Sequence, residues 1–152
     1  MRGKATKSIV IRFRYPARLL PDRDGEILVS FRDLPECLTS GADKAAALTE
    51  ARGALEEAIA GRIAGGEPIP VPSARRAGEQ LVTVPPEMAA KAAFVLAFRE
   101  SGLSRLAFAR SLGVNEKVVR RMLDPHHGTA ANRIYKALRI LGRELIVETR
   151  SA

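Results

Sequence analysis

The stretch DLPECLTSG, residues 33–41, decides how the first half of this chain folds. Its proline ends the strand pattern that precedes it, because proline has no N–H to donate to a β-ladder. An amphipathic run follows from Asp43 to Ile63, and the Asp43 carboxylate is well suited to cap the first turn of a helix. The stretch therefore predicts a corner at which a small sheet passes into the helix that covers it.

Short strands are predicted around this corner. Apolar and basic residues alternate in Ile9–Tyr15, and Ile27–Phe31 shows the same two-residue period, which is typical of half-buried strands. Leu20–Gly25 lies between them and contains the Asp-Gly pair of a tight turn. We therefore predict an antiparallel hairpin, with further short strands at Cys37–Thr39 and Leu81–Val84.

The covering helix is predicted from an apolar stripe at helical spacing. The stripe consists of Ala45, Leu48, Ala51, Leu55, Ile59 and Ile63. We expect the helix to end near Gly65-Gly66, since glycine readily adopts the backbone conformation found after helix ends. The proline-rich segment 67–73 then has to run extended, because each proline disfavours helical backbone in the residue before it.

From Pro86 onward the pattern becomes helical. Proline suits the first position of a helix, and helices are predicted over 87–100 and 129–141, with Gly102 and Gly142 as the residues that end them. The fold class that follows is an α+β domain over residues 1–85, with a small antiparallel sheet covered by a helix. An all-α domain over residues 86–152 comes after it.

Residues 105–123 fit a helix-turn-helix within this second domain. Ala109 is small where the two helices would cross, and Gly113 supplies the permissive backbone that the tight turn needs. The residues expected to face inward are Phe108, Leu112, Val114, Val118 or Val119, and Met122.

The formal net charge of +8 is distributed unevenly along the chain. Residues 1–80 hold 13 Lys/Arg and 11 Asp/Glu, whereas residues 81–152 hold 12 and 6. A net charge of +6 therefore lies in the second half, as expected for a surface that binds a polyanion.

This charge suggests that the helix-turn-helix binds DNA. In the usual docking, the N-terminal part of the second helix enters the major groove. Arginine can bond a guanine edge and asparagine can read adenine, while residues at the start of the first helix contact the backbone. The predicted DNA-binding residues are Ser104, Arg105, Asn115, Lys117, Arg120 and Arg121. The alternative is a plain helical hairpin whose basic face is only solvated.

Residues 144–150 predict a C-terminal strand. A strand that follows a helical bundle has no local partner, so we expect it to pair with its copy in a second subunit or with that subunit's DNA-binding domain. A homodimer or larger assembly also suits the predicted function, because two helix-turn-helix units can bind half-sites about 34 Å apart or a multiple of that distance.

The compartment predicted from the sequence is the cytoplasm. The single Cys37 is unlike the paired cysteines of small secreted domains. No apolar run approaches the roughly 18 residues that a membrane-spanning helix needs. The basic segment 1–7 is followed only by the short Ile9–Ile11, which does not make a signal peptide. We therefore expect no contact with a membrane.

The first half resembles the HicB antitoxin family. The resemblance is carried by the strand Gly25–Phe31, the corner 33–35, Gly41 before the helix, and the exit IPVPS at 69–73; a helix-turn-helix half beginning near Pro86 also resembles many members. It implies a truncated ribonuclease-H-like fold without nuclease activity, which grips a HicA-type mRNA ribonuclease toxin while the C-terminal half represses the operon. Two residues depart from the family pattern: Glu36 stands where glycine is usual, and Ala46 where a glutamate is usual.

An acidic stretch in this half is a candidate for toxin binding. Between residues 22 and 36, five carboxylates stand against Arg23 and Arg32. A ribonuclease must be cationic where it holds RNA, so an acidic edge could imitate phosphates and steer association. The predicted toxin-binding residues are Asp22, Asp24, Glu26, Asp33 and Glu36. A solvated hairpin with turn-forming aspartates is the alternative.

Other functions are less well supported by the sequence. A ribonuclease-H-like nuclease would need Asp22, Asp24 and Asp33 as metal ligands, but two of these lie in a turn. Cys37 lacks a nearby base and is interpreted as a half-buried hydrophobe, and His126-His127 as part of a loop. We therefore expect no catalytic residue, no metal and no cofactor. A stand-alone dimeric transcriptional regulator with an N-terminal sensing module remains the main alternative.

Overall fold

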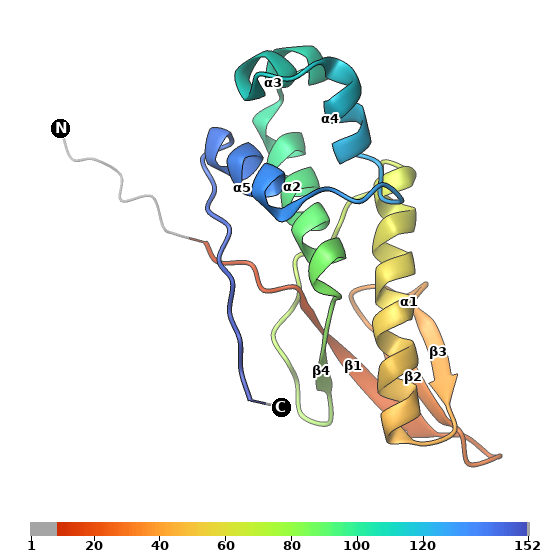
Figure 1. Ribbon diagram of the computed structural model, residues 1–152. Helices are drawn as coiled ribbons and strands as arrows, with labels where there is room; N and C mark the ends of the chain where they lie inside the picture. The colour runs from red at the N-terminus through yellow and green to blue at the C-terminus, as the bar shows by residue number, and fades with distance from the viewer. Residues whose placement is uncertain (1–8, 152) are drawn as a thin grey trace.

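The computed structural model describes residues 9–151, so the basic segment 1–7 of the signal-peptide prediction lies outside the described residues. A four-stranded antiparallel sheet in the order β3-β2-β1-β4 is covered by one long helix, and shorter helices follow (Figure 1). The strands are β1 Arg14–Pro21, β2 Ile27–Phe31, β3 Leu38–Gly41 and β4 Gln80–Thr83. The helices are α1 Lys44–Ala64, α2 Pro86–Ser101, α3 Arg105–Leu112, α4 Glu116–Met122 and α5 Ala131–Ile140. The predicted order, an α+β half followed by a helical half, is confirmed.

The first strand lies further along the chain than the sequence predicts. Strand β1 begins at Arg14, and its ladder with β2 runs from Ala17, opposite Phe31, to Pro21, opposite Ile27. One residue after β1 ends, the Asp22 N–H donates to the main-chain oxygen of Glu26 at 2.8 Å, and this bond closes the hairpin. The predicted strand Ile9–Tyr15 is therefore wrong for most of its length. Alternation alone could not locate the strand, because its position depends on where this turn closes.

Helix α1 buries a slightly different stripe from the one predicted. Ala51, Leu55, Ile59 and Ile63 are buried as expected, but Ala45 is exposed and Leu48 only partly covered, while Ala47 and Ala60 are buried. The cause is the close approach of the first turn to β3. A Cβ added at Gly41 would lie 2.6 Å from the Ala47 Cα. The sequence predicts the cap correctly, since the Asp43 carboxylate accepts the Ala46 N–H at 2.8 Å.

Polar contacts fix the proline-rich exit against the corner. The Asp33 carboxylate accepts the Ser73 N–H at 2.8 Å and the Ser73 hydroxyl at 2.6 Å. The Tyr15 hydroxyl donates to the Pro70 oxygen at 2.7 Å. The corner and strand β1 therefore fix the position of the proline-rich segment that follows α1.

An ion pair between Arg32, after β2, and Glu79, just before β4, also joins the corner to the segment that follows the prolines. The Arg32 Nε donates to the Glu79 carboxylate at 2.7 Å, and the Arg76 N–H donates to it at the same distance. The Glu79 side chain is only 6% exposed. The hydrogen bond from Arg32, more than any other contact, lowers the pKa of Glu79 from 4.5 to about 2.

The two halves of the chain touch. Helix α2 lies beside α1 (Figure 1), and the Arg99 guanidinium donates to the Glu67 oxygen just after α1 at 2.7 Å. One hydrophobic cluster extends from Tyr15 in the sheet to Leu138 in α5. The division into domains 1–85 and 86–152 stays a prediction.

The C-terminal segment 144–150 forms no strand ladder within residues 9–151. It leaves α5 and runs down beside the start of the sheet (Figure 1), where Glu148 pairs with Arg12 at 3.2 Å and Arg150 contacts Thr83. Its pairing with a second subunit therefore stays a prediction. In the described part of the chain, no helix is long and apolar enough to cross a membrane.

Candidate functional site

Helices α3 and α4 meet at a tight turn, as the sequence predicts. Gly113 ends α3 with a φ of 73°, a left-handed conformation that glycine adopts without strain. The Ser104 hydroxyl caps α3 by accepting the Ala107 N–H at 3.0 Å, and the Asn115 side chain caps α4 by accepting the Val118 N–H at 3.2 Å. Two of the predicted DNA-binding side chains thus also set where each helix begins.

An aromatic cluster anchors this helix pair to α2. The Phe108 ring of α3 lies 5.7 Å from the Phe94 ring and 5.5 Å from the Phe98 ring, measured between centroids. On α4, Val119 and Met122 are fully buried. One side of each helix is therefore fixed in the core, and the opposite side of α4 is free to meet a partner.

The free side of α4 is basic. Lys117, Arg120 and Arg121 are all exposed there, while Val119 between them points into the core. The Glu116 carboxylate lies 3.1 Å from the Arg120 guanidinium and 3.2 Å from that of Arg105 on α3. The structure thus brings four predicted cations onto one surface and places a carboxylate between two of them.

A buried lysine on α2 supports α4 from behind. The Lys91 side chain is 3% exposed, and its ammonium donates to the main-chain oxygens of Met122 and His127 and to the Thr129 hydroxyl, at 2.7–2.9 Å. Burial lowers the pKa of Lys91, against the opposing charges of Asp124 and Glu87. A carbonyl group at the end of α4 is thereby satisfied by a side chain from another helix.

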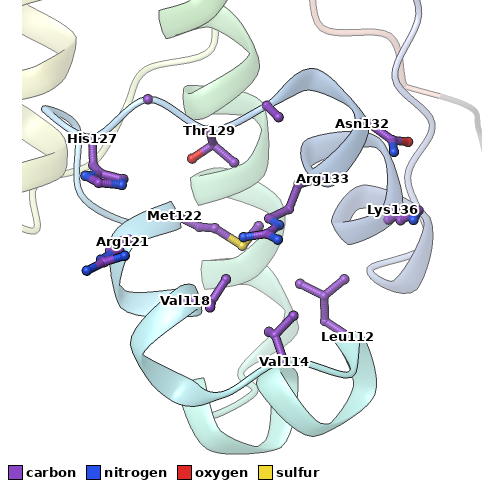
Figure 2. Close-up of a pocket in the computed structure, with 12 residues that line it drawn as sticks. Leu112, Val114, Val118, Arg121, Met122, His127, Thr129, Asn132, Arg133 and Lys136 are labelled. Carbon is purple, nitrogen blue, oxygen red and sulfur yellow. The ribbon is translucent and has the colours of Figure 1, made fainter.

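A groove of about 470 Å³ lies between α4 and α5 (Figure 2). Its floor is apolar and includes Val118 and Met122, and its rim carries Arg121, Arg133 and Lys136. His127 and Thr129 line it from the loop that joins the two helices.

The five predicted toxin-binding carboxylates do not form one surface. Asp22, Asp24 and Glu26 lie in the loop between β1 and β2, whereas Asp33 and Glu36 lie beyond the other end of β2. The five residues of β2 separate the two groups by roughly 16 Å, at about 3.3 Å per residue.

Four of these carboxylates have partners within the chain, among them Glu26, which accepts the Ser40 hydroxyl at 2.9 Å. The Asp22 side chain accepts the N–H groups of Asp24 and Glu26 at 2.8 and 2.9 Å, which shapes the turn. Asp33 is bound to Ser73, and its side chain is only 9% exposed. Glu36 pairs with Arg62 on α1 and remains 43% exposed. Asp24 and Glu26 are the exposed carboxylates at the hairpin tip.

Exposed leucines lie on the sheet face opposite α1. Val29 and Phe31 point toward α1 and are buried, so the alternate residues of β2 point to the open face. Leu28 pairs there with Leu20 of β1, and Leu38 of β3 stands opposite Ser30 on the same face. All three leucines are exposed, and no pattern in the sequence marked them as a surface.

The structure gives no support for metal chemistry at the aspartates. Asp22 and Asp24 stand at one end of β2 and Asp33 at the other, and among residues 9–151 no three His, Cys, Asp or Glu side chains are grouped to hold a metal ion. Cys37 is buried more fully than predicted, at 2% exposure, and burial raises the pKa of its thiol to about 11. The thiol is therefore protonated at neutral pH and packs as a small hydrophobe.

Sequence reasoning missed Lys91, Glu116 and the cations of α5. A lysine inside an otherwise apolar, alanine-rich helix was a usable signal for Lys91, because such a helix is expected to be buried. No pattern marked Arg133 and Lys136, since their position beside α4 depends on how α5 folds back.

Known antitoxins are similar to this chain in sequence. A family model described as "HicB_like antitoxin of bacterial toxin-antitoxin system" matches residues 14–93. The chain is 34% identical to Antitoxin HicB of Escherichia coli (strain K12) over 132 residues, which is 87% of this chain and 96% of that protein. It is 34% identical to Antitoxin HicB 1 of Photorhabdus laumondii over 143 residues, covering 94% and 91%. Antitoxin HicB of Pseudomonas fluorescens is 28% identical over 143 residues, covering 93% and 97%.

Proposed function

Because this chain belongs to the family of HicB-like antitoxins of bacterial toxin–antitoxin systems, we propose that it neutralises a HicA-type mRNA ribonuclease and represses its own operon. The toxin would bind the α+β half, and operator DNA the helical half, in the cytoplasm. Operator binding is supported mainly by the exposed basic side of α4. The opposite side of this helix is fixed in the core by Val119 and Met122.

Operator binding would follow the usual helix-turn-helix docking. Helix α4 has only about two turns, so once its N-terminal part enters the major groove, Lys117 in the first turn and Arg120 and Arg121 in the last turn can all meet base edges or flanking phosphates. Arg105, at the start of α3, contacts the backbone. Ser104 and Asn115 keep their capping bonds and can still offer their remaining polar atoms to a phosphate.

Toxin binding would use the hairpin tip and the open face of the sheet. Asp24 and Glu26 offer negative charge there, and the exposed Leu20 and Leu28 beside them offer apolar area. A surface that combines the two suits a ribonuclease, whose RNA-binding groove must be cationic. Asp22, Asp33 and Glu36 would act mainly by shaping this half.

The active species would be a homodimer or a larger assembly, joined through segment 144–150. Ile146 and Val147 of this segment are exposed in the single chain. Deletion of residues 144–152 is therefore expected to reduce the molar mass measured by light scattering. An unchanged assembly would exclude this segment as the joint.

Co-expression with the small open reading frame beside this gene tests the proposal. We expect that frame alone to arrest growth, and this chain to restore growth and to co-purify with its product. Continued arrest with no complex would contradict the antitoxin role. An Asp24→Lys, Glu26→Lys variant should weaken the complex and its dependence on salt, while Glu50→Lys, Glu57→Lys on the exposed side of α1 serves as the control.

A further inference from the structure

The groove between α4 and α5 extends beyond the two helices assigned above to operator binding, because residues of α5 line its other side. From its chemistry we infer a second DNA contact, in which Arg133 and Lys136 of α5, together with Arg121 of α4, bind backbone phosphates beside the major groove. This inference rests on the proposed DNA binding and extends its surface from two helices to three.

Arg133 lies over an apolar floor, with Arg121 on one side of the groove and Lys136 on the other (Figure 2). In Figure 2, Arg133 reaches from α5 toward Met122, and Lys136 stands one turn further along the same helix. Val118 and Met122 form the floor beneath them. Apolar floor atoms can pack against the aliphatic stems of arginine and lysine, but they offer no partner to the charged ends. The charges are therefore left for an anion from outside.

The side chains that line the groove include cations but no carboxylate. Among residues 9–151, none of those that line it is acidic, and Glu87 approaches only its Gly128. Within the described part of the chain, Arg121, Arg133 and Lys136 take part in no ion pair, whereas Arg105 and Arg120 both pair with Glu116. The groove is thus the more available half of the basic surface.

The groove also continues the basic side of α4. Lys117 and Arg121 are four residues apart and share one face of the helix, and the neighbouring Val118 already lines the groove. A helix with its side chains is about 10–12 Å across and the major groove of DNA about 12 Å wide, so elements that flank an inserted helix meet the two backbones. With α4 docked in this way, Arg133 and Lys136 of the neighbouring α5 would take that flanking position.

The salt dependence of DNA binding tests this inference. The probes are a duplex carrying the promoter region upstream of this gene and a scrambled duplex of the same length. For the double variant Arg133→Ala, Lys136→Ala, the slope of log K against log salt should become shallower by about 0.9 for each phosphate that is no longer neutralised. The affinity for both duplexes should fall by a similar factor, because phosphates carry no sequence information.

The control is Lys44→Ala, Arg52→Ala, which removes the same charge from exposed positions on α1 and should leave the slope unchanged. If the wild-type chain binds the promoter duplex and the α5 variant shows the same salt slope as the wild type, the inference is overturned, while the proposed repression stands. A change only in the assembly measured by light scattering would also overturn it, and would assign the groove to a protein segment. If the wild-type chain bound neither duplex at any salt concentration, both the inference and the proposed repression would fail.

Discussion

The ammonium group of Lys91 on α2 donates a 2.9 Å hydrogen bond to the main-chain oxygen of Met122, the last residue of α4. Two further bonds reach the His127 oxygen and the Thr129 hydroxyl in the following loop. A positive charge at this end also complements the dipole of α4. The helix proposed to enter DNA is therefore held at its far end by a side chain buried outside the helix pair.

Replacing Lys91 with methionine tests this support. The change keeps an unbranched side chain but leaves buried acceptors without a donor, so the free energy of unfolding should fall by about 1–3 kcal/mol in urea titration. Lys44→Met, at an exposed position on α1, should change it by less than about 0.5 kcal/mol. Equal unfolding midpoints for the two variants would mean that the Lys91 bonds add no stability.

Gly41→Ala tests the close approach between the corner and α1. The added methyl group would lie 2.6 Å from the Ala47 Cα and 2.7 Å from the Ala46 carbonyl carbon, so the helix or the strand must move. We expect a melting temperature lower by several degrees, as is usual for a loss above about 1 kcal/mol in a domain of this size. Gly61→Ala is the control, since among the described residues nothing lies within 4 Å of its added Cβ. It should stabilise the exposed side of α1 by roughly 0.5–1 kcal/mol.

The Glu79 carboxylate should make stability depend on pH in the acidic range. Its pKa in the folded chain is about 2, below the ordinary 4.5, so the unfolded chain binds this proton more readily. The stabilisation is fully present above about 4.5 and is lost as the pH falls toward 2. Chemical unfolding at several pH values should therefore show a shallower decline for Glu79→Gln than for the wild type. Glu57→Gln, on the exposed surface of α1, should keep the wild-type slope.

Glu116→Gln tests whether this carboxylate restrains the basic surface. The substitution removes a negative charge from the surface proposed to bind DNA and releases Arg105 and Arg120. We expect affinity for a scrambled duplex to rise several-fold in fluorescence anisotropy, with a steeper dependence on salt. A weaker or unchanged affinity would show that Glu116 does not oppose binding.

Patterns along the chain predicted most of the elements, because caps, glycines and apolar periods act over a few residues. The Asp43 and Ser104 caps and the glycines that end α2 and α3 are such local signals. The start of β1 is not set by a local signal, since it depends on where the hairpin turn closes. The role of Asp33 could not be predicted from its neighbours in the sequence either, because its partner Ser73 reaches it only after α1 has crossed the sheet.

For the candidate site as well, the sequence predicts the features that depend on helical spacing but not those that depend on packing. The basic side of α4 follows from helical spacing, and the structure places Lys117, Arg120 and Arg121 together as expected. Glu116 was not expected between Arg105 and Arg120, because the neighbour of a charge across two helices depends on their packing. The acidic stretch failed as a single surface, since β2 carries its two parts to opposite ends.

The central claim, that toxin and DNA bind to different halves of one chain, is tested most directly by the double variant Arg120→Ala, Arg121→Ala. Both side chains are exposed and lie outside the core, so the fold should survive. We predict that operator binding is abolished while the variant still rescues growth from the co-expressed toxin as fully as the wild type. Loss of both activities in a variant with an unchanged melting temperature would contradict the claim.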